Sequence, residues 1–209
     1  MNEIPVIFES EGLILEGRIT YGDKTRAAVV THPHPQYGGD MQNPVVQSIA
    51  RVYQKKGYTT LRFNFRGTGK SQGSYAEGSG EMRDLVAAFR YLQEQGYSAI
   101  DLAGYSFGVW VNAHAAGEIQ PARQIMVAPP AALMDFSQLG TIAGLKLVVT
   151  GSEDEFAPPR LVAPLVRSWE PGARFHVIEG ADHFLFASLD ELEATLSAEI
   201  HPAAGQSGV

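Results

Sequence analysis

Short apolar runs alternate along this chain with segments whose apolar residues recur at helical spacing, and this alternation constrains the fold more than any other feature. Several runs are apolar enough to be buried on both faces. The runs that predict strands are Val6–Ser10, Leu13–Tyr21, Ala27–Thr31, Thr59–Phe65, Ala99–Ala103, Gln124–Val127, Leu145–Thr150 and Arg174–Ile178. Helical spacing follows Pro44, runs from Met82 to Leu92, can continue after Gly108, and returns from Leu185 to Ile200.

Two hairpin-like strands followed by repeated strand–helix units predict an α/β fold: about eight strands in a mostly parallel sheet, with helices on both faces. Such sheets place their sites at the C-terminal ends of the strands. Ser188 and Glu191 have the spacing of a capping box at the start of the last helix. With 209 residues, 44% of them hydrophobic, we expect a single domain over residues 1–200 and a disordered tail over residues 201–209.

The amino-acid composition excludes several classes of function. The net charge of -7 argues against a nucleic-acid or membrane surface, because those ligands require clustered basic residues. The absence of cysteine excludes disulfides, thiolate metal sites and a cysteine nucleophile. Neither a signal peptide nor a membrane-spanning run is visible, so we expect a cytoplasmic protein.

The stretch FNFRGTGKSQG, residues 63–73, has two conflicting interpretations. Its GTGKS core is similar to the end of a phosphate loop, but that motif requires a glycine where this chain has Asn64, and a helix directly after it. Three glycines between Gly73 and Gly80 oppose that helix. The same stretch satisfies GxSxG around Ser71, yet a nucleophile turn also needs a following helix.

A second GxSxG motif, GYSFG at residues 104–108, fits better. It follows the apolar strand AIDLA and precedes VWVNAHAAG, which can be helical. Gly104 and Gly108 lie where the crowded turn tolerates no Cβ. We therefore expect Ser106 to be a catalytic nucleophile.

A serine needs a histidine to accept its proton and a carboxylate to orient that histidine, and in this fold type the order is serine, acid, histidine. Of six histidines, only His183 lies in the loop between the last strand and the last helix. The loop GSEDEF after strand LKLVVT offers three carboxylates, among which we favour Asp154. Its alternative role is that of a carboxylate capping the helix at Pro158.

A tetrahedral intermediate also needs two backbone donors, and Phe107 is the first candidate. The second should come from THPHPQYGGD after the third strand, where Pro33 and Pro35 lack an amide hydrogen. His34 is our first choice there, with Gln36 and Tyr37 as alternatives.

Five segments together resemble the small α/β-hydrolases related to dienelactone hydrolases and simple carboxylesterases. These are HPHPQYGGDMQNPVV (32–46), FNFRGTGKSQG (63–73), GYSFG (104–108), GSEDEFAPP (151–159) and GADHF (180–184). The resemblance covers residues 5 to 200 and implies the α/β-hydrolase fold, a Ser106–His183–Asp154 triad and an oxyanion hole near His34 and Phe107. It also implies that FRGTGKSQG is a structural turn tied by Arg66 and Ser71. It departs from dienelactone hydrolases in its nucleophile, because those enzymes use cysteine.

We expect a cofactor-free serine esterase acting on small esters with short acyl groups. Residues 128–144 are too few for a helical lid, so the site should be open and bordered by Tyr37, Tyr105, Phe156 and Phe184, with Phe107, Leu133 and Phe136 as further candidates. Amide, peptide, thioester or perhydrolysis chemistry, a non-catalytic binding module and a homodimer all stay open. The remaining alternative is a metal hydrolase that uses His32 and His34 as ligands. We do not favour it, and we expect no metal site.

Overall fold

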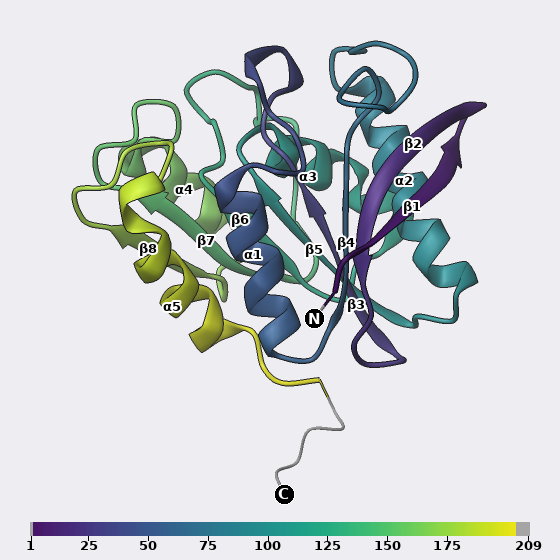
Figure 1. Ribbon diagram of the computed structural model, residues 1–209. Helices are drawn as coiled ribbons and strands as arrows, with labels where there is room; N and C mark the ends of the chain where they lie inside the picture. The colour runs from purple at the N-terminus through teal and green to yellow at the C-terminus, as the bar shows by residue number, and fades with distance from the viewer. Residues whose placement is uncertain (1, 204–209) are drawn as a thin grey trace, which may run out of the picture.

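The computed structural model describes residues 2–203 and contains one eight-stranded sheet (Figure 1). The strands are β1 (Ile4–Ser10), β2 (Leu13–Thr20), β3 (Arg26–Thr31), β4 (Thr59–Phe63), β5 (Ala99–Tyr105), β6 (Gln124–Val127), β7 (Leu145–Gly151) and β8 (Arg174–Ile178). The helices are α1 (Pro44–Lys55), α2 (Ser79–Glu94), α3 (Phe107–Ile119), α4 (Pro159–Trp169) and α5 (Leu189–Glu199), with 3-10 turns at Pro35–Tyr37 and Phe186–Ser188.

The sheet has the strand order β1-β2-β4-β3-β5-β6-β7-β8. β1 pairs with β2, and β2 with β4, in antiparallel fashion; all other neighbours are parallel. Helices α1 and α5 lie side by side on one face, whereas α2, α3 and α4 cover the other (Figure 1). The predicted α/β-hydrolase architecture is therefore confirmed, and the C-terminal ends of the parallel strands meet at one edge of the sheet.

All eight predicted strands are present, and their ends differ little from the prediction. β5 extends to Tyr105 rather than Ala103, and β4 ends at Phe63 rather than Phe65. The strands β3, β4 and β6 are almost completely buried, as their continuous apolar character predicts. Residues 128–144 form turns without a helix, so the predicted absence of a lid is also confirmed.

The predicted capping box of α5 is wrong. The Ser188 side chain forms no capping hydrogen bond, and the Glu191 carboxylate lies 3.9 Å from His176 Nε2 instead. The physical reason is that Ser188 ends a 3-10 turn. The φ of -123° and ψ of 19° at Ser188 differ from the extended conformation in which an N-cap hydroxyl reaches the helix amides. A carboxylate does cap α2, where Glu81 accepts hydrogen bonds from the Ala76 and Gly78 amides.

The segment 63–73 is the structural turn that the resemblance implied. Ser71 Oγ donates to the Asn64 carbonyl at 2.7 Å and accepts from the Glu16 amide at 3.1 Å. Lys70 is exposed, and α2 begins only at Ser79. Neither a phosphate loop nor a nucleophile turn therefore occupies this segment.

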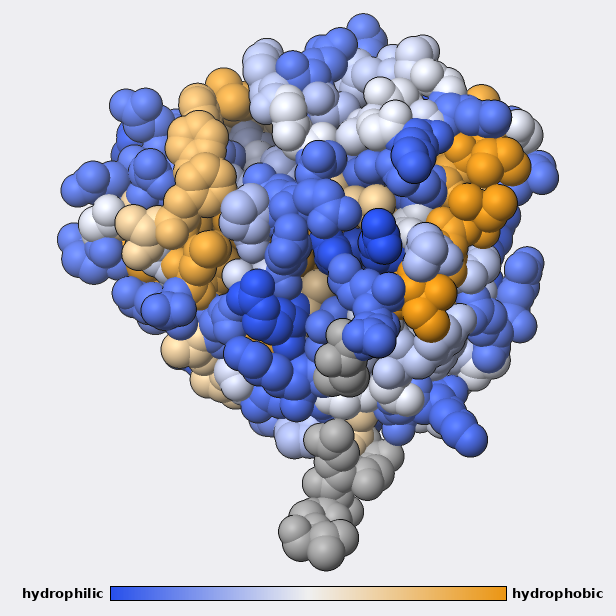
Figure 2. Space-filling model, in the orientation of Figure 1, coloured by the Kyte–Doolittle hydropathy of each residue, from blue (hydrophilic) through white to orange (hydrophobic). Residues whose placement is uncertain are grey.

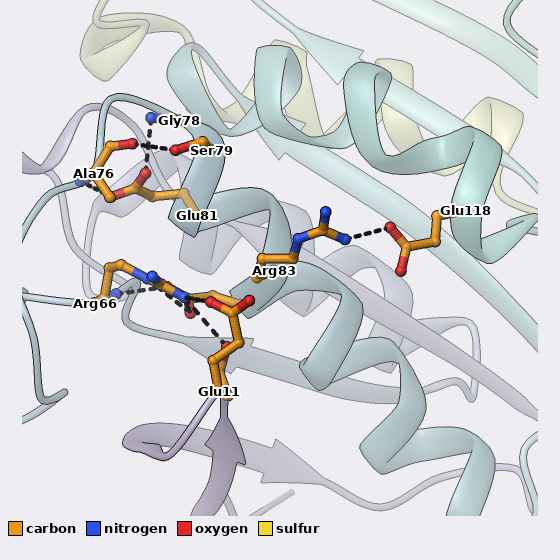
Figure 3. A network of polar contacts seen from close by, with 10 residues as sticks. Glu11, Arg66, Ala76, Gly78, Ser79, Glu81, Arg83 and Glu118 are labelled. Carbon is orange, nitrogen blue, oxygen red and sulfur yellow. Dashed lines mark hydrogen bonds and ion pairs between the residues drawn. The ribbon is translucent and has the colours of Figure 1, made fainter.

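Arg66 ties this turn to α2 and to the first hairpin. Its guanidinium forms an ion pair with Asp84 at 2.8 Å and a second, more exposed pair with Glu11 at 3.2 Å. Asp84 is fully buried and also accepts from the Arg66 amide at 2.8 Å. Figure 3 shows Arg66 reaching toward Glu11, while Arg83 turns away to contact Glu118 on α3.

Apolar residues remain exposed in two places on the face shown in Figure 2. One group lies over β1 and β2, where Ile4, Ile7 and Ile14 are exposed. The other lies over the loops beside β8 and α5, where Phe184 and Phe186 are exposed.

Part of the predicted C-terminal tail lies within the described residues. The Ala203 amide donates to the Lys56 carbonyl at 2.9 Å, and Ala203 packs with the core beneath α1 and α5. Residues 204–209 lie outside the described residues. No helix within residues 2–203 has the length and apolar character needed to cross a membrane.

The buried Arg66–Asp84 pair generates a stability prediction. Replacing Asp84 with Ala leaves a buried guanidinium without its main partner, so we expect the free energy of unfolding to fall by about 3–5 kcal/mol. The matched control is Glu118→Ala, which removes a half-exposed carboxylate from the exposed Arg83 and Arg90 and should cost less than about 1 kcal/mol. Urea denaturation measures both, and equal effects would contradict a structural role for the Arg66–Asp84 pair.

Candidate active site

Ser106 occupies a sharp turn between β5 and α3. Its φ of 54° and ψ of -118° lie outside the regions that residues with a Cβ normally adopt, so the backbone is strained there. The Ser106 amide donates to the Val127 carbonyl at 2.9 Å, which fixes the turn to β6. The side chain is 8% exposed at the C-terminal edge of the sheet.

Gly104 and Gly108 allow this turn because no side chain fits at either position. A Cβ on Gly104 would lie 2.7 Å from Thr31 Oγ1, and one on Gly108 would lie 2.5 Å from the same atom. The first turn of α3 therefore packs directly against the end of β3. This close contact agrees with the expectation that neither glycine of GYSFG can be replaced by a residue with a Cβ.

Ser106, His183 and Asp154 form a continuous hydrogen-bonded chain. Ser106 Oγ lies 2.9 Å from His183 Nε2, and His183 Nδ1 lies 2.9 Å from both carboxylate oxygens of Asp154. A carboxylate only accepts, so this contact assigns the proton to Nδ1 and leaves Nε2 free to accept from the serine. The structure thus brings together the three residues predicted from the sequence.

Asp154 contacts His183 and also binds the turn before α4, but no side chain caps that helix. Its Oδ1 atom accepts from the amides of Phe156 and Ala157 at 2.9 and 2.7 Å, which fixes the turn before α4. Both of its oxygens also contact the histidine. The neighbouring carboxylates of Glu153 and Glu155 are exposed.

Tyr105 lies inside the protein and supports the histidine loop. It is 2% exposed, and its hydroxyl donates to the His183 carbonyl at 2.9 Å. Burial and the nearby Asp154 and Asp182 carboxylates raise the pKa of Tyr105, so the hydroxyl remains a donor. We predicted Tyr105 as a substrate contact, but its side chain does not reach the opening.

The loop after β3 lies next to the start of α3, where the His34 ring contacts that of Phe107. The Gln36 amide donates to His34 Nδ1 at 3.3 Å, and the Tyr37 amide donates to the His34 carbonyl at 3.1 Å. Two of the three predicted donors are therefore engaged within the loop. Among the described residues, the His34 amide has no acceptor, and the Phe107 amide, first in α3, has none within its helix.

Contacts between tilted aromatic rings connect this loop to α3. The His34 ring lies 4.8 Å from that of Phe107, 4.9 Å from Tyr75 and 4.9 Å from Tyr37. Burial lowers the pKa of His34, which favours its neutral form. The sequence analysis did not identify Tyr75, because it follows a glycine-rich turn with no recognisable motif.

His32 is a buried structural residue whose two ring nitrogens are both engaged. Nε2 accepts from the Phe65 amide at 3.0 Å, which places the proton on Nδ1, 2.7 Å from the Pro33 carbonyl. Burial lowers the pKa of His32 to about 4. His32 thus links the end of β3 to the segment after β4. Residues 2–203 contain no cluster of three or more metal-ligating side chains.

Aromatic side chains lie near both His34 and His183. Tyr37 is 86% exposed in the loop that carries His34, and Phe184 is 51% exposed next to His183. Phe156 is half-buried, with its ring 4.9 Å from that of His183. Among our further candidates, Leu133 is exposed, whereas Phe107 and Phe136 are buried. Phe186, 54% exposed, was not predicted, although the pattern HFLF, with every second residue aromatic, could have indicated it.

The comparisons with solved structures indicate one class. An α/β serine hydrolase homologue from Coxiella burnetii is 36% identical, covers 96% of this chain and 98% of its own, and superposes with a TM-score of 0.88. An α/β serine hydrolase without a lid from Xanthomonas campestris is 30% identical over 98% of this chain and 97% of its own, with a TM-score of 0.90. An uncharacterized protein of Rickettsia prowazekii is 31% identical over 196 residues, 88% of this chain and 82% of that protein. No protein-family model matches the chain.

The fold and these similarities define a hydrolase of the α/β-hydrolase class. The chain belongs to the lid-less α/β serine hydrolases.

The buried His32 makes stability depend on pH. Its pKa is about 4 in the folded protein against about 6.5 in the unfolded chain, so its contribution is complete above pH 6.5 and is lost as the pH falls toward 4. The full loss is about 3 kcal/mol. We expect His32→Gln to flatten the pH slope of the unfolding free energy between pH 6.5 and 4.5, whereas His201→Gln, at an exposed position, leaves it unchanged. Unfolding titrations at several pH values test this, and equal slopes for all three proteins would contradict it.

The strained turn generates a second stability prediction. Ser106→Ala keeps a Cβ in the strained conformation, whereas Ser106→Gly removes it. We expect the glycine variant to be more stable than the alanine variant by about 1 kcal/mol, because relief of strain exceeds the entropic cost of glycine. Urea denaturation of the two variants makes the comparison, and a more stable alanine variant would show that the turn stores no strain.

Proposed function

We propose that this chain hydrolyses small carboxylic esters through an acyl-enzyme, with Ser106 as nucleophile, His183 as general base and acid, and Asp154 as the residue that orients His183. The observation that supports this most directly is the hydrogen-bonded chain from Ser106 Oγ through the two nitrogens of His183 to Asp154. An unassisted serine hydroxyl is a weak nucleophile at neutral pH, and such a chain removes its proton as it attacks.

In the acylation step, Ser106 Oγ attacks the ester carbonyl carbon while its proton moves to His183 Nε2. The imidazolium ion that forms is stabilised by the Asp154 carboxylate. The tetrahedral intermediate then collapses: the bond between the carbonyl carbon and the alcohol oxygen breaks, and His183 Nε2 returns the proton to that oxygen. The alcohol leaves, and the acyl group stays on Ser106.

In the deacylation step, water takes the place of the alcohol. The water oxygen attacks the acyl carbon while His183 accepts a proton from the water. His183 then protonates Ser106 Oγ as the acid departs. We propose that the amides of Phe107 and His34 stabilise the negative oxygen in both steps. Support comes from the contact between the His34 and Phe107 rings, 4.8 Å apart, and from the engagement of the Gln36 and Tyr37 amides elsewhere.

The substrate should carry a short acyl group. Without a lid, the enzyme has no helical cover to surround a long acyl chain, and residues 128–144 follow the surface as turns. Each additional methylene of a long chain would therefore stay in water rather than gain the usual burial energy.

A fluorophosphonate probe, which reacts with activated serines, tests the proposed nucleophile. We expect one adduct, mapped by mass spectrometry to Ser106 and lost in His183→Ala, and we expect Ser106→Ala to reduce kcat/KM for a short ester at least about 1000-fold. Ser71→Ala is the matched control, because Ser71 lies in the other GxSxG segment and should keep the adduct. A folded protein without an adduct would favour a binding module, and an adduct on Ser71 would refute the assignment.

A further inference from the structure

The loop that carries His183 holds two phenylalanines outward beside it. The Asp182 carboxylate accepts from the amides of Phe184 and Leu185 at 3.0 and 3.1 Å. Leu185 has a positive φ of 58° and is buried in the core. With Leu185 anchored inward, Phe184 and Phe186 are 51% and 54% exposed. This backbone arrangement presents both rings to solvent on the same loop.

The two rings form part of an aromatic group around His183. The centroids of Phe184 and Phe186 are 5.9 Å apart, and Phe184 lies 6.1 Å from the His183 ring. Phe156 meets the His183 ring edge-on at 4.9 Å. Exposed aromatic side chains gathered beside a reactive group commonly mark a ligand contact.

A surface cavity of about 450 Å³ adjoins this group. Phe184, Phe186 and Ala181 line its apolar side, and Glu153 and Asp182 lie at its polar edge. None of the described residues that line it is basic. The cavity therefore offers aromatic contacts together with negative charge.

The chemistry of the proposed reaction determines which part of the ester meets these residues. His183 Nε2 must protonate the alcohol oxygen as the ester bond breaks, so that oxygen must lie within hydrogen-bond distance of Nε2. The carbon attached to that oxygen then points away from Ser106, along the His183 side of the site. The acyl group lies on the other side of the reacting carbon.

We propose that Phe184 and Phe186 bind the alcohol part of the substrate, and that this enzyme prefers esters of aromatic alcohols without negative charge. This inference rests on the proposed function. A flat ring can stack on the exposed phenylalanines, whose faces prefer offset or edge contacts with another aromatic ring. The Glu153 and Asp182 carboxylates repel an alcohol part that carries a carboxylate of its own.

Three acetate esters test the preference: benzyl, cyclohexylmethyl and 4-carboxybenzyl acetate. All three give the same acetyl-enzyme, so deacylation is common to them and kcat/KM reports the acylation step alone. Benzyl and cyclohexylmethyl acetate carry primary alcohols of similar size. We expect kcat/KM for the benzyl ester to exceed that for the cyclohexylmethyl ester by about 2- to 12-fold, as expected for one aromatic pair.

Substitutions locate the source of this ratio. Phe184→Leu should bring the ratio of benzyl to cyclohexylmethyl ester close to one, whereas Phe184→Tyr should preserve it. Tyr21→Leu is the matched control, because Tyr21 is also 51% exposed but lies at the end of β2, where its hydroxyl faces Gln95 after α2. A ratio near one in the unmodified enzyme, or one that Phe184→Leu does not change, would overturn the proposal.

The charged ester tests the second part of the proposal. We expect 4-carboxybenzyl acetate to react more slowly than benzyl acetate, and Glu153→Gln to narrow that difference by about 2- to 5-fold. Glu94→Gln changes the net charge equally on the distant helix α2 and should leave the difference intact. Equal effects of the two variants would refute a local role for Glu153.

The failure of this inference can be told apart from the failure of the proposed function. If Ser106 takes up fluorophosphonate and the acetates are hydrolysed without an aromatic preference, the alcohol-side assignment is wrong and the esterase stands. If none of the acetates is hydrolysed and Ser106 takes up no probe, the proposed function is wrong, and this inference is refuted with it.

Discussion

The close contact between the end of β3 and the first turn of α3 is the constraint on which the site depends. It exists because Gly104 and Gly108 leave room for Thr31 and for the backbone of His32. The same contact holds Ser106 in its strained conformation and brings the ring of His34 next to the ring of Phe107. A side chain at either glycine would separate the end of β3 from the start of α3. The strain at Ser106 and the position of the His34 loop therefore have a common cause.

The loop that carries His183 is held by interactions other than those that hold the serine turn. The serine turn and the histidine loop meet at the contact between Ser106 and His183. Asp154 holds the imidazole ring, Tyr105 holds the His183 carbonyl, and Asp182 fixes the turn after the histidine. Tyr105 is also the residue that precedes Ser106, so one covalent link joins the serine turn to the support of the histidine. This arrangement explains why an aromatic residue that is only 2% exposed lies inside the motif GYSFG.

Features that depend on local pattern and chain order could be predicted from the sequence, whereas features that depend on spatial contacts could not. The strands, Ser106 and its partners could be identified because apolar periodicity and the order serine, acid, histidine are visible in one dimension. Ser188 and Glu191 matched a capping pattern, yet a preceding 3-10 turn prevented the cap. The direction in which Tyr105 points and the pairing of Arg66 with Asp84 depend on elements distant in sequence, and no local pattern encodes them.

Because the site has no lid, the exclusion of water during a reaction would depend on the bound substrate itself. Ser106 and His183 are each only 8% exposed, but no helix closes over them to exclude water during the reaction. Electrostatic stabilisation is stronger when water is excluded from the site. In an open site, an apolar group of the bound substrate can provide that exclusion by covering the histidine. Exposed aromatic side chains next to His183 would then contribute to the rate of the chemical step as well as to binding.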